Sequence, residues 1–419
     1  MKTRENITDF KQKALLWANT FDTCCFLDSN HYNDQYANYD FVLAAGARSE
    51  ITGTTGDAFE KLKAHFETHR SWLFGFFSYD LKNETEDLTS QNPDHLKFPD
   101  LYFFAPEYLI VSKNGNIEVL IGAESILSEI CKVEVAEHPV NLSHRMQNKL
   151  TKATYIDRVK QLQKHIVQGD VYELNFCQEF FAEHAHINPL QIYQQLNKYS
   201  PTPFGGYFKH QHHYIISATP ERFLCKRGNR LISQPIKGTA KRSTDPAEDL
   251  QIRLNLKQDV KEQAENVMIV DLVRHDLTKS AVKGSVQVEE LFGIYSFPQV
   301  HQMISTISCE LNPEVHFVDA IKNAYPMGSM TGAPKVKAME LIEQYEESKR
   351  GMYSGSFGCI SSDGDFDFNV VIRSILYNAQ SEYLSFQVGG AITFQSDPEK
   401  EYEECMLKAS AMMKVLGGA

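Results

Sequence analysis

The chain has 419 residues, 42% of them apolar and 23% charged, which is enough to bury one large hydrophobic core or two ordinary ones. Its formal net charge of −12 argues against nucleic acid or an anionic membrane surface as a partner. No apolar run is long enough to span a bilayer, no hydrophobic signal region follows the first residues, and the eight cysteines form no CxxC pair. We therefore expect a cytoplasmic protein with free thiols.

Strand-like and helix-like segments alternate along the chain. Hairpin turns are predicted at 113–116 and 227–230. The predicted strands span residues 215–217, 222–226, 230–234, 367–376 and 383–388, and the predicted amphipathic helices span 155–168, 258–278, 334–348 and 398–415. Strand pairs separated by single helices indicate an α+β fold built on antiparallel sheet.

A polar segment that contains Pro139, residues 134–145, marks a plausible seam in the chain. Residues 1–140 carry strands such as the one at 72–80 but little recognisable chemistry. We expect this N-terminal region to pack into the same fold as residues 145–419 rather than to form a separate module.

Lys237 is a charged residue in an otherwise apolar and turn-forming stretch, 234–239, and it follows Glu221 by sixteen positions. A carboxylic acid and an amine on neighbouring strands are the minimum set of groups for replacing a hydroxyl by a nucleophile. These two residues are therefore the first candidates for catalysis.

The segment 325–335 is a glycine-rich turn that leads into a helix with Pro334 at its first position. Its backbone N–H groups would face an anion such as a carboxylate, although an ordinary helix start is the alternative. Arg373 on a predicted strand and Tyr353 between two glycines are further carboxylate-binding candidates. The alternatives are an exposed strand arginine and a packed aromatic side chain.

Glu401, Glu404 and Lys408 lie on one face of the C-terminal helix, and Glu265 precedes an apolar run on another helix. Carboxylates from separate helices can share Mg²⁺, which is typically bound through one or two carboxylates and ligand oxygens. The alternative is a solvated helix face with a Glu404–Lys408 ion pair.

From about Thr154 to the C-terminus, ordered motifs occur at 169–175, 220–223, 235–239, 268–277, 328–335, 350–355 and 397–408. In these motifs the chain closely resembles the chorismate-utilising enzymes, a family that includes anthranilate, aminodeoxychorismate, isochorismate and salicylate synthases. The resemblance implies chorismate as the substrate. It also implies large antiparallel β-sheets that form a sandwich-like core with helices on the outside.

The resemblance assigns expected roles to individual residues. Glu265 and Glu404, with Glu401 adjacent, match Mg²⁺ ligands that hold the ring carboxylate of chorismate. The positions that match substrate-binding residues are Tyr353, Arg373, Gly389 and Gly390 for the enolpyruvyl carboxylate, and His301, Thr331 and Lys408 for the pocket wall.

Lys237 distinguishes members of the family, because anthranilate synthases usually have alanine at this position and aminodeoxychorismate synthases have lysine. The resemblance to the latter implies that Lys237 attacks C2 of chorismate while Glu221 protonates the departing 4-hydroxyl group. Ammonia then adds at C4 and gives 4-amino-4-deoxychorismate, a precursor of 4-aminobenzoate and folate. This chemistry requires a protonated Glu221 and a depressed pKa for Lys237, for which Lys241, Arg242 or Mg²⁺ are candidate causes.

Two positions depart from the family pattern. Glu173 stands where amine-forming members usually have glutamine and water-adding members have lysine. No base for activating water is therefore evident, and isochorismate formation is disfavoured. Ala391 replaces a glycine that is common after Gly389 and Gly390, and its methyl group is expected to tighten or shift the carboxylate pocket.

The expected product contains nitrogen, but the sequence has no cysteine in the glycine-flanked nucleophile elbow of a glutaminase. Ammonia is therefore expected from solution or from a separate glutamine amidotransferase subunit. One alternative is an anthranilate synthase large subunit. The lysine at position 237 argues against it. The other is an inactive homologue that binds a regulatory ligand, since residues 26–30 resemble an element that holds tryptophan in relatives.

Overall fold

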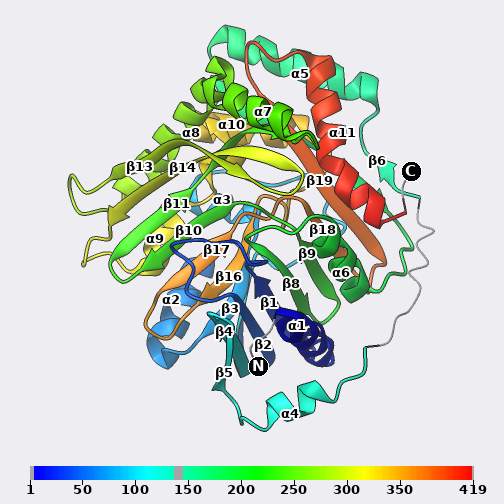
Figure 1. Ribbon diagram of the computed structural model, residues 1–419. Helices are drawn as coiled ribbons and strands as arrows, with labels where there is room; N and C mark the ends of the chain where they lie inside the picture. Colours follow the sequence, from blue (N-terminus) through cyan, green and yellow to red (C-terminus); the bar gives the residue numbers. More distant parts are fainter. Residues whose placement is uncertain (1–3, 136–144, 418–419) are drawn as a thin grey trace.

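The computed structural model of the chain describes residues 4–135 and 145–417. Its nineteen strands are connected by antiparallel pairing, and helices surround them (Figure 1). The strands are β1 (Thr23–Asp28), β2 (Phe41–Gly53), β3 (Leu73–Phe77), β4 (Leu101–Lys113), β5 (Asn116–Ile121), β6 (Gln147–Asn148), β7 (Glu173–Ala182), β8 (Gly205–His210), β9 (His213–Ser217), β10 (Arg222–Arg227), β11 (Arg230–Gln234), β12 (Ile236–Lys241), β13 (Gln287–Ser296), β14 (Val300–Glu310), β15 (Gly332–Ala333), β16 (Ser356–Ile360), β17 (Phe366–Asn369), β18 (Ser374–Asn378) and β19 (Tyr383–Ile392). The α-helices are α1 (Arg4–Ala18), α2 (Ala58–His69), α3 (Lys82–Thr85), α4 (Ile126–Cys131), α5 (Lys152–Gln168), α6 (Pro189–Tyr199), α7 (Pro246–Gln258), α8 (Val260–Thr278), α9 (Phe317–Ala324), α10 (Lys335–Tyr345) and α11 (Pro398–Val415), and short 3₁₀ turns lie at η1 (Tyr79–Leu81) and η2 (Gly328–Met330).

Strand β4 is the branch point of the sheet, since it pairs with β2, β3 and β5. One arm runs from β2 through β1, β8, β9, β18 and β19 to β7. The other arm runs from β3 through β16, β17, β10 and β11 to β14, which also pairs with β12 and β13. Strands of the N-terminal region are thus hydrogen-bonded, within both arms, to strands from much later in the chain.

The first arm of the sheet separates two hydrophobic clusters. Cys25 and Val42 belong to a cluster that includes residues of the second arm and of α2, α8 and α9, whereas Cys24 and Leu43 belong to one that includes α1, α5, α6 and α11. Successive side chains of a strand point to opposite faces, so one cluster fills the space between the arms and the other lies beneath the outer helices. The predicted α+β fold with a large antiparallel sheet is confirmed.

Most predicted elements are present with small changes in their bounds, but one strand prediction is wrong. The segment 367–376 is divided into β17 and β18, and between them Arg373 has a φ of +50°, which an extended strand does not allow. The helix predicted at 258–278 is α8, which begins at Val260 because the side chain of Asp259 accepts hydrogen bonds from the first backbone N–H groups. Pro334 caps α10 one position before the first helical residue.

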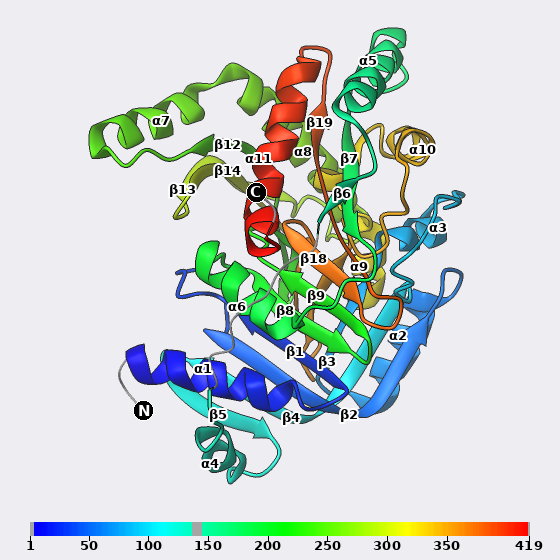
Figure 2. The ribbon, with the colours of Figure 1, turned by 90° about the vertical axis from the view of Figure 1, so that its right-hand side faces the viewer.

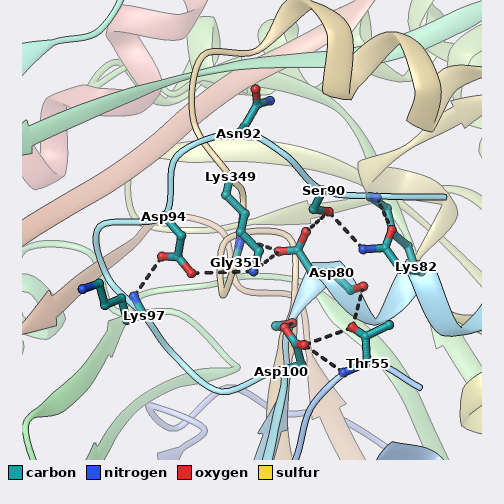
Figure 3. A network of polar contacts seen from close by, with 12 residues as sticks. Thr55, Asp80, Lys82, Ser90, Asn92, Asp94, Lys97, Asp100, Lys349 and Gly351 are labelled. Carbon is teal, nitrogen blue, oxygen red and sulfur yellow. Dashed lines mark hydrogen bonds and ion pairs between the residues drawn. The ribbon is translucent and has the colours of Figure 1, made fainter. Parts of the chain in front are cut away.

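A polar network joins the N-terminal region to the loop after α10 (Figure 3). The backbone N–H of Gly351 donates to Asp80 Oδ2 at 3.0 Å, and Asp80 is only 2% exposed. The ammonium group of Lys349 lies 3.9 Å from Asp80 and 3.6 Å from Asp94. Because Tyr353 follows Gly351 closely, this network anchors the loop that carries a predicted substrate-binding residue.

The predicted seam at 134–145 lies largely outside the described residues, since 136–144 are not among them. Among the helices that the structure describes, none has both the length and the apolar character that crossing a bilayer requires. All eight cysteines lie in the described part of the chain, and none of them forms a disulfide.

Candidate active site

A cavity of about 1000 Å³ lies where the ends of the two sheet arms meet helices α8 and α11. Helices α7, α8 and α11 lie toward one end of the molecule, and α1 and α4 lie at the other (Figure 2). The predicted site residues that line the cavity are Glu221, Lys237, Glu265, Tyr353, Arg373, Gly389, Glu401, Glu404 and Lys408. Residues from four of the predicted motifs, together with Glu265, Arg373 and Gly389, therefore meet around one space.

Lys237 reaches the cavity from a β-bulge in β12. Ile236 pairs with Ile304 and Thr239 pairs with Gln302, so Lys237 and Gly238 together stand opposite the single residue Met303. Gly238 has a φ of +98°, a conformation that a residue without a side chain adopts at little cost. A bulge changes the direction of the side chain beside it, and Lys237 therefore lines the cavity.

The ammonium group of Lys237 forms an ion pair with the carboxylate of Glu173, at 2.8 Å between Nζ and Oε1. Burial alone would lower the pKa of Lys237. The carboxylates of Glu173, Glu265 and Glu404 outweigh this effect, so the pKa of the lysine is raised above its ordinary value. The predicted depressed pKa is therefore wrong for the protein without substrate, and neither Lys241 nor Arg242 lines the cavity to lower it.

Glu221 is 4% exposed and lies on the loop between β9 and β10, next to the β12 bulge. The backbone N–H of Val370 donates to its carbonyl oxygen at 3.0 Å, which fixes the loop. Burial raises the pKa of its carboxyl group to about 7, although Ser329 and Lys237 act in the opposite direction. Near neutral pH, Glu221 therefore holds a proton for a large part of the time, as an acid catalyst requires.

Arg373, Tyr353 and Gly389 form the side of the cavity where a substrate carboxylate was expected. The guanidinium of Arg373 forms no ion pair within the described residues, so its charge is available to an anion. The hydroxyl of Tyr353 lies 3.1 Å from the sulfur of Cys177. A Cβ on Gly389 would lie 2.0 Å from the carbonyl oxygen of Phe176, so only glycine fits at this position of β19.

The three carboxylates expected to bind Mg²⁺ line one part of the cavity. Asp397 caps the start of α11 and so positions Glu401 and Glu404, while Glu265 comes from α8. One oxygen of Glu265 is buried without a hydrogen-bond partner, and burial raises the pKa of its carboxyl group to about 7. The described residues contain no cluster of three His, Cys, Asp or Glu side chains that would hold a metal ion alone.

These carboxylates nevertheless fit a magnesium ion that receives further oxygen ligands from a substrate. Mg²⁺ prefers carboxylate oxygens, typically uses only one or two of them from the protein, and takes its remaining ligands from substrate or water. Glu265 Oε1 is buried without a hydrogen bond and has only the Lys261 ammonium group at 3.6 Å, so a bound cation would stabilise it. A cation would also relieve the repulsion from Glu404, which adds to the larger effect of burial in raising the pKa of Glu401.

Lys408 and Gly390 lie beside these carboxylates. The Lys408 ammonium group contacts Glu404 at 2.7 Å and donates to the carbonyl oxygen of Gly389 at 2.9 Å. Gly390 does not itself line the cavity, but a Cβ there would lie 3.3 Å from an oxygen of Glu401. A side chain at Gly390 would therefore crowd the carboxylates from behind.

Two predicted pocket residues lie elsewhere. His301 is 2% exposed and is held by Ser296 and Asp249, with Nδ1 2.8 Å from Ser296 Oγ and Nε2 3.0 Å from Asp249 Oδ1. Its neighbour Gln302 lines the cavity instead, because successive residues of β14 point to opposite sides. Thr331 is fully buried, and its hydroxyl donates to the carbonyl oxygen of Gly328 at 3.2 Å.

Several residues of the site were not predicted from the sequence. They include Asn175, Lys261, Glu262, Gln302 and Ser329, which line the cavity, and Glu173 as the partner of Lys237. Lys261 lies one turn before Glu265, at 3.6 Å, and this spacing was a signal present in the sequence. The sequence also showed that Glu173 departs from the family pattern, but it did not show that Glu173 pairs with Lys237.

A second cavity of about 780 Å³ lies away from this site. Leu27, Asp28 and Ser29 of the expected tryptophan-binding element line it, together with Phe204 and Arg222. Arg222 is buried, and its guanidinium binds the carboxylates of Asp367 and Asp34. The binding of tryptophan remains a prediction for this cavity.

Comparisons with known proteins identify the family. The chorismate binding enzyme family model matches residues 22–414, so this chain belongs to the chorismate-binding enzymes. The match extends further toward the N-terminus than the motifs on which the resemblance was based. It includes both arms of the sheet and every residue of the cavity described above.

Relatives similar in sequence include both aminodeoxychorismate synthases and anthranilate synthases. The chain is 31% identical to aminodeoxychorismate synthase component 1 of Escherichia coli, over 93% of this chain and 92% of that protein. It is 32% identical to anthranilate synthase component 1 of Aquifex aeolicus, over 83% of this chain and 75% of that protein. The crystal structure of anthranilate synthase component I from Streptococcus pneumoniae superposes with a TM-score of 0.80, at 25% identity, over 91% of this chain and 93% of that one.

Proposed function

We propose that this protein transfers nitrogen from ammonia to chorismate and forms 4-amino-4-deoxychorismate. The observation that carries the proposal is Lys237, a lysine aimed by a β-bulge into the same cavity as the buried acid Glu221. The relative from Escherichia coli that is named component 1 supports it, and so do the unpaired Arg373 and the carboxylates of α8 and α11. The ammonia would come from a separate glutamine amidotransferase subunit, and the product would lead to 4-aminobenzoate and folate.

Each residue has a distinct role in this reaction. The guanidinium of Arg373 and the hydroxyl of Tyr353 bind the enolpyruvyl carboxylate of chorismate and fix the ring. Lys237 adds to C2, and Glu221 donates its proton to the 4-hydroxyl group, which leaves as water. Ammonia then adds at C4 and displaces the lysine from C2.

Mg²⁺ would be held by Glu265, Glu404 and Glu401. When bound, it would neutralise the ring carboxylate of chorismate and add positive charge to the site. Lys408 shields the charge of Glu404, since the lysine is the main reason why the pKa of that carboxyl group is lowered. Glu404 is thereby kept ionised and available as an oxygen donor.

The proposed product can be tested with purified protein, chorismate, Mg²⁺ and an ammonium salt. We expect a product that becomes 4-aminobenzoate only after 4-amino-4-deoxychorismate lyase is added. We also expect Lys237→Ala to abolish this product, because the only other residue of the β12 bulge is Gly238, which has no side chain to replace the amine. Chromatography with fluorescence detection measures both outcomes.

A matched control is Lys241→Ala, which removes an exposed lysine from the same strand without changing the cavity lining. This variant should retain turnover. Direct appearance of fluorescent anthranilate with release of pyruvate would show that the protein is an anthranilate synthase component instead. Unchanged ammonia-dependent turnover in Lys237→Ala would rule out the lysine as the nucleophile.

A further inference from the structure

Glu173 is a buried carboxylate with a single cationic partner. It begins β7, its side chain is 0% exposed, and its Oε1 lies 2.8 Å from the Nζ of Lys237. Apart from Lys237, no described residue hydrogen-bonds to either of its oxygens. A carboxylate with no other donor from the described residues in such a place is costly unless its charge is used or neutralised.

The position of Glu173 restricts what it can do. It does not line the cavity, whereas Lys237 does, so the lysine lies between this carboxylate and the substrate space. Glu173 is therefore less well placed than Lys237 to act on a water or ammonia molecule in the cavity. Within residues 4–135 and 145–417, the amine of Lys237 is the one side-chain group that forms an ion pair or hydrogen bond with its carboxylate.

The other acidic groups that face Lys237 are farther away and have different surroundings. Glu262 and Glu265 come from α8, Glu404 comes from α11, and Glu221 comes from the loop before β10. None of them forms an ion pair with Lys237, and Glu404 is already bound by Lys408. Glu173 is thus the one carboxylate in the described structure that is placed to exchange a proton directly with Lys237.

We propose that Glu173 is the internal proton acceptor for Lys237, a positioning residue that converts the ammonium group into a neutral amine when substrate is bound. This inference rests on the proposed function, because it assigns a role in the attack of Lys237 on chorismate. It explains why a carboxylate stands at a position where the family pattern led us to expect an amide.

The proton balance closes over one reaction cycle. Oε1 of Glu173 takes one proton from the Lys237 ammonium group, and the neutral amine forms a bond to C2 while the C4–O bond breaks. The two ring π pairs shift between these carbons, and Glu221 gives its proton to the departing oxygen to form water. When ammonia adds at C4, the C2–N bond breaks, Glu221 takes the proton of the new C4 ammonium, and Lys237 recovers its proton from Glu173.

If Glu173 were only a counter-ion of Lys237, its removal would change the rate of attack by Lys237 in the opposite direction. The two roles can therefore be distinguished by this rate. If Glu173 only kept Lys237 charged, its removal would leave the lysine neutral more often and the attack would become faster. If Glu173 accepts the proton, its removal forces the proton to leave through the cavity and slows the attack. The variant Glu173→Gln keeps the size of the side chain and removes both its charge and its ability to accept a proton, so the two roles predict opposite changes in rate.

The experiment measures the covalent adduct of Lys237 with chorismate in the absence of ammonia, by rapid quenching and intact-protein mass spectrometry. Peptide mapping locates the adduct. For Glu173→Gln we expect the adduct to form about 100-fold more slowly near neutral pH, the scale of a lost proton acceptor. The ratio of the mutant rate to the wild-type rate should rise with pH as hydroxide replaces the missing carboxylate, and any titration of Glu221 cancels in this ratio.

Two further variants separate this role from a structural one. Glu173→Asp keeps a carboxylate and should recover a large part of the rate. Glu179→Gln removes another buried carboxylate from β7, one that accepts a hydrogen bond from Ser348 at 2.6 Å and does not line the cavity, and it should leave the rate unchanged. Thermal unfolding and chorismate binding show whether each variant is folded.

Each outcome is decisive. Adduct formation in Glu173→Gln that is as fast as in the wild type, or faster, would overturn the inference and leave the proposed function intact. Loss of rate in Glu173→Asp as severe as in Glu173→Gln would also overturn it. Absence of any wild-type adduct, with retained turnover in Lys237→Ala, would overturn both the inference and the lysine mechanism.

Discussion

Glu221 and Glu265 show how burial can give two carboxyl groups in one cavity the same pKa but opposite uses. Burial raises the pKa of each to about 7. In the proposed reaction Glu221 is useful while it holds its proton, because its role there is to donate that proton to the departing hydroxyl. As a proposed magnesium ligand, Glu265 would be useful after it loses its proton, because only the ionised carboxylate binds such an ion well.

The titration of Glu221 predicts a pH dependence with a definite sign. At saturating Mg²⁺, formation of the Lys237 adduct should be fastest below pH 7 and should fall above it as Glu221 loses its proton. Glu221→Gln should be slower by about 100-fold or more and should lose this fall, because an amide donates no proton. Rapid-quench rates from pH 6 to 9 provide the measurement.

The control for this prediction is Glu262→Gln, which removes a different carboxyl group from the same cavity and should keep the fall above pH 7. A wild-type rate that rises through neutral pH at saturating Mg²⁺ would contradict the role of Glu221. Such a rise is the behaviour expected if ionisation of Glu265 were limiting instead.

At the scale of a single element, the bulge in β12 determines where Lys237, the proposed nucleophile, points. Lys237 and Gly238 occupy the space opposite one residue of β14, and Gly238 adopts a left-handed φ of +98°. A Cβ at Gly238 would lie 3.1 Å from the Cβ of Met303 and from an oxygen of Glu262. Both the backbone conformation and the packing therefore favour glycine.

Gly238→Ala should lower the free energy of unfolding by about 1–3 kcal/mol, through strain and crowding, and should reduce adduct formation at Lys237. The matched control is Gly228→Ala in the β10–β11 turn. Gly228 also has a positive φ, +61°, but no atom lies within 4 Å of a Cβ placed there. Chemical denaturation of both variants gives the stability change. Normal adduct formation in Gly238→Ala would show that the bulge does not direct the lysine.

At the scale of the whole molecule, the N-terminal region supports the active site through contacts far from the substrate. Asp80 accepts a hydrogen bond from Gly351, and the hydroxyl of Tyr325 donates to the carbonyl oxygens of Phe77 and Ser78 at 3.1 and 2.9 Å. The Gly351 bond holds the loop before Tyr353 against the segment after β3 (Figure 3), and the Tyr325 bonds hold the segment after α9 against the end of β3.

Asp80→Asn should destabilise the protein by about 1–3 kcal/mol, because a buried carboxylate that accepts several hydrogen bonds is replaced by an amide. The Michaelis constant for chorismate should rise, since the loop that carries Tyr353 loses an anchor. Asp87→Asn, an exposed change in the same region, should alter neither quantity. Equal effects of the two substitutions, measured by denaturation and steady-state kinetics, would contradict this account of the network.

Local sequence patterns predicted the helices and most of the strands, and they also predicted the site residues whose position depends on a single helix or strand. Helix α11 begins at Pro398 as expected because Asp397 caps it, and its spacing puts Glu401, Glu404 and Lys408 at the cavity. The break at Arg373 was missed, since alternating apolar residues resemble one strand and carry no signal for a left-handed turn. The Glu173–Lys237 pair was missed because β7 and β12 are not neighbours in the sheet, so no local rule brings them together.

The pairing of β3 with β16 affects when the sheet can form during synthesis of the chain. Phe77 pairs with Ser356 and Leu73 with Ile360, so the N-terminal sheet remains incomplete until almost the entire chain has been made. Contacts of such long sequence separation slow folding and leave strand edges exposed during synthesis. A chain truncated before β16 would therefore leave one edge of β3 unpaired and would lack Arg373, Gly389 and the α11 residues that line the cavity.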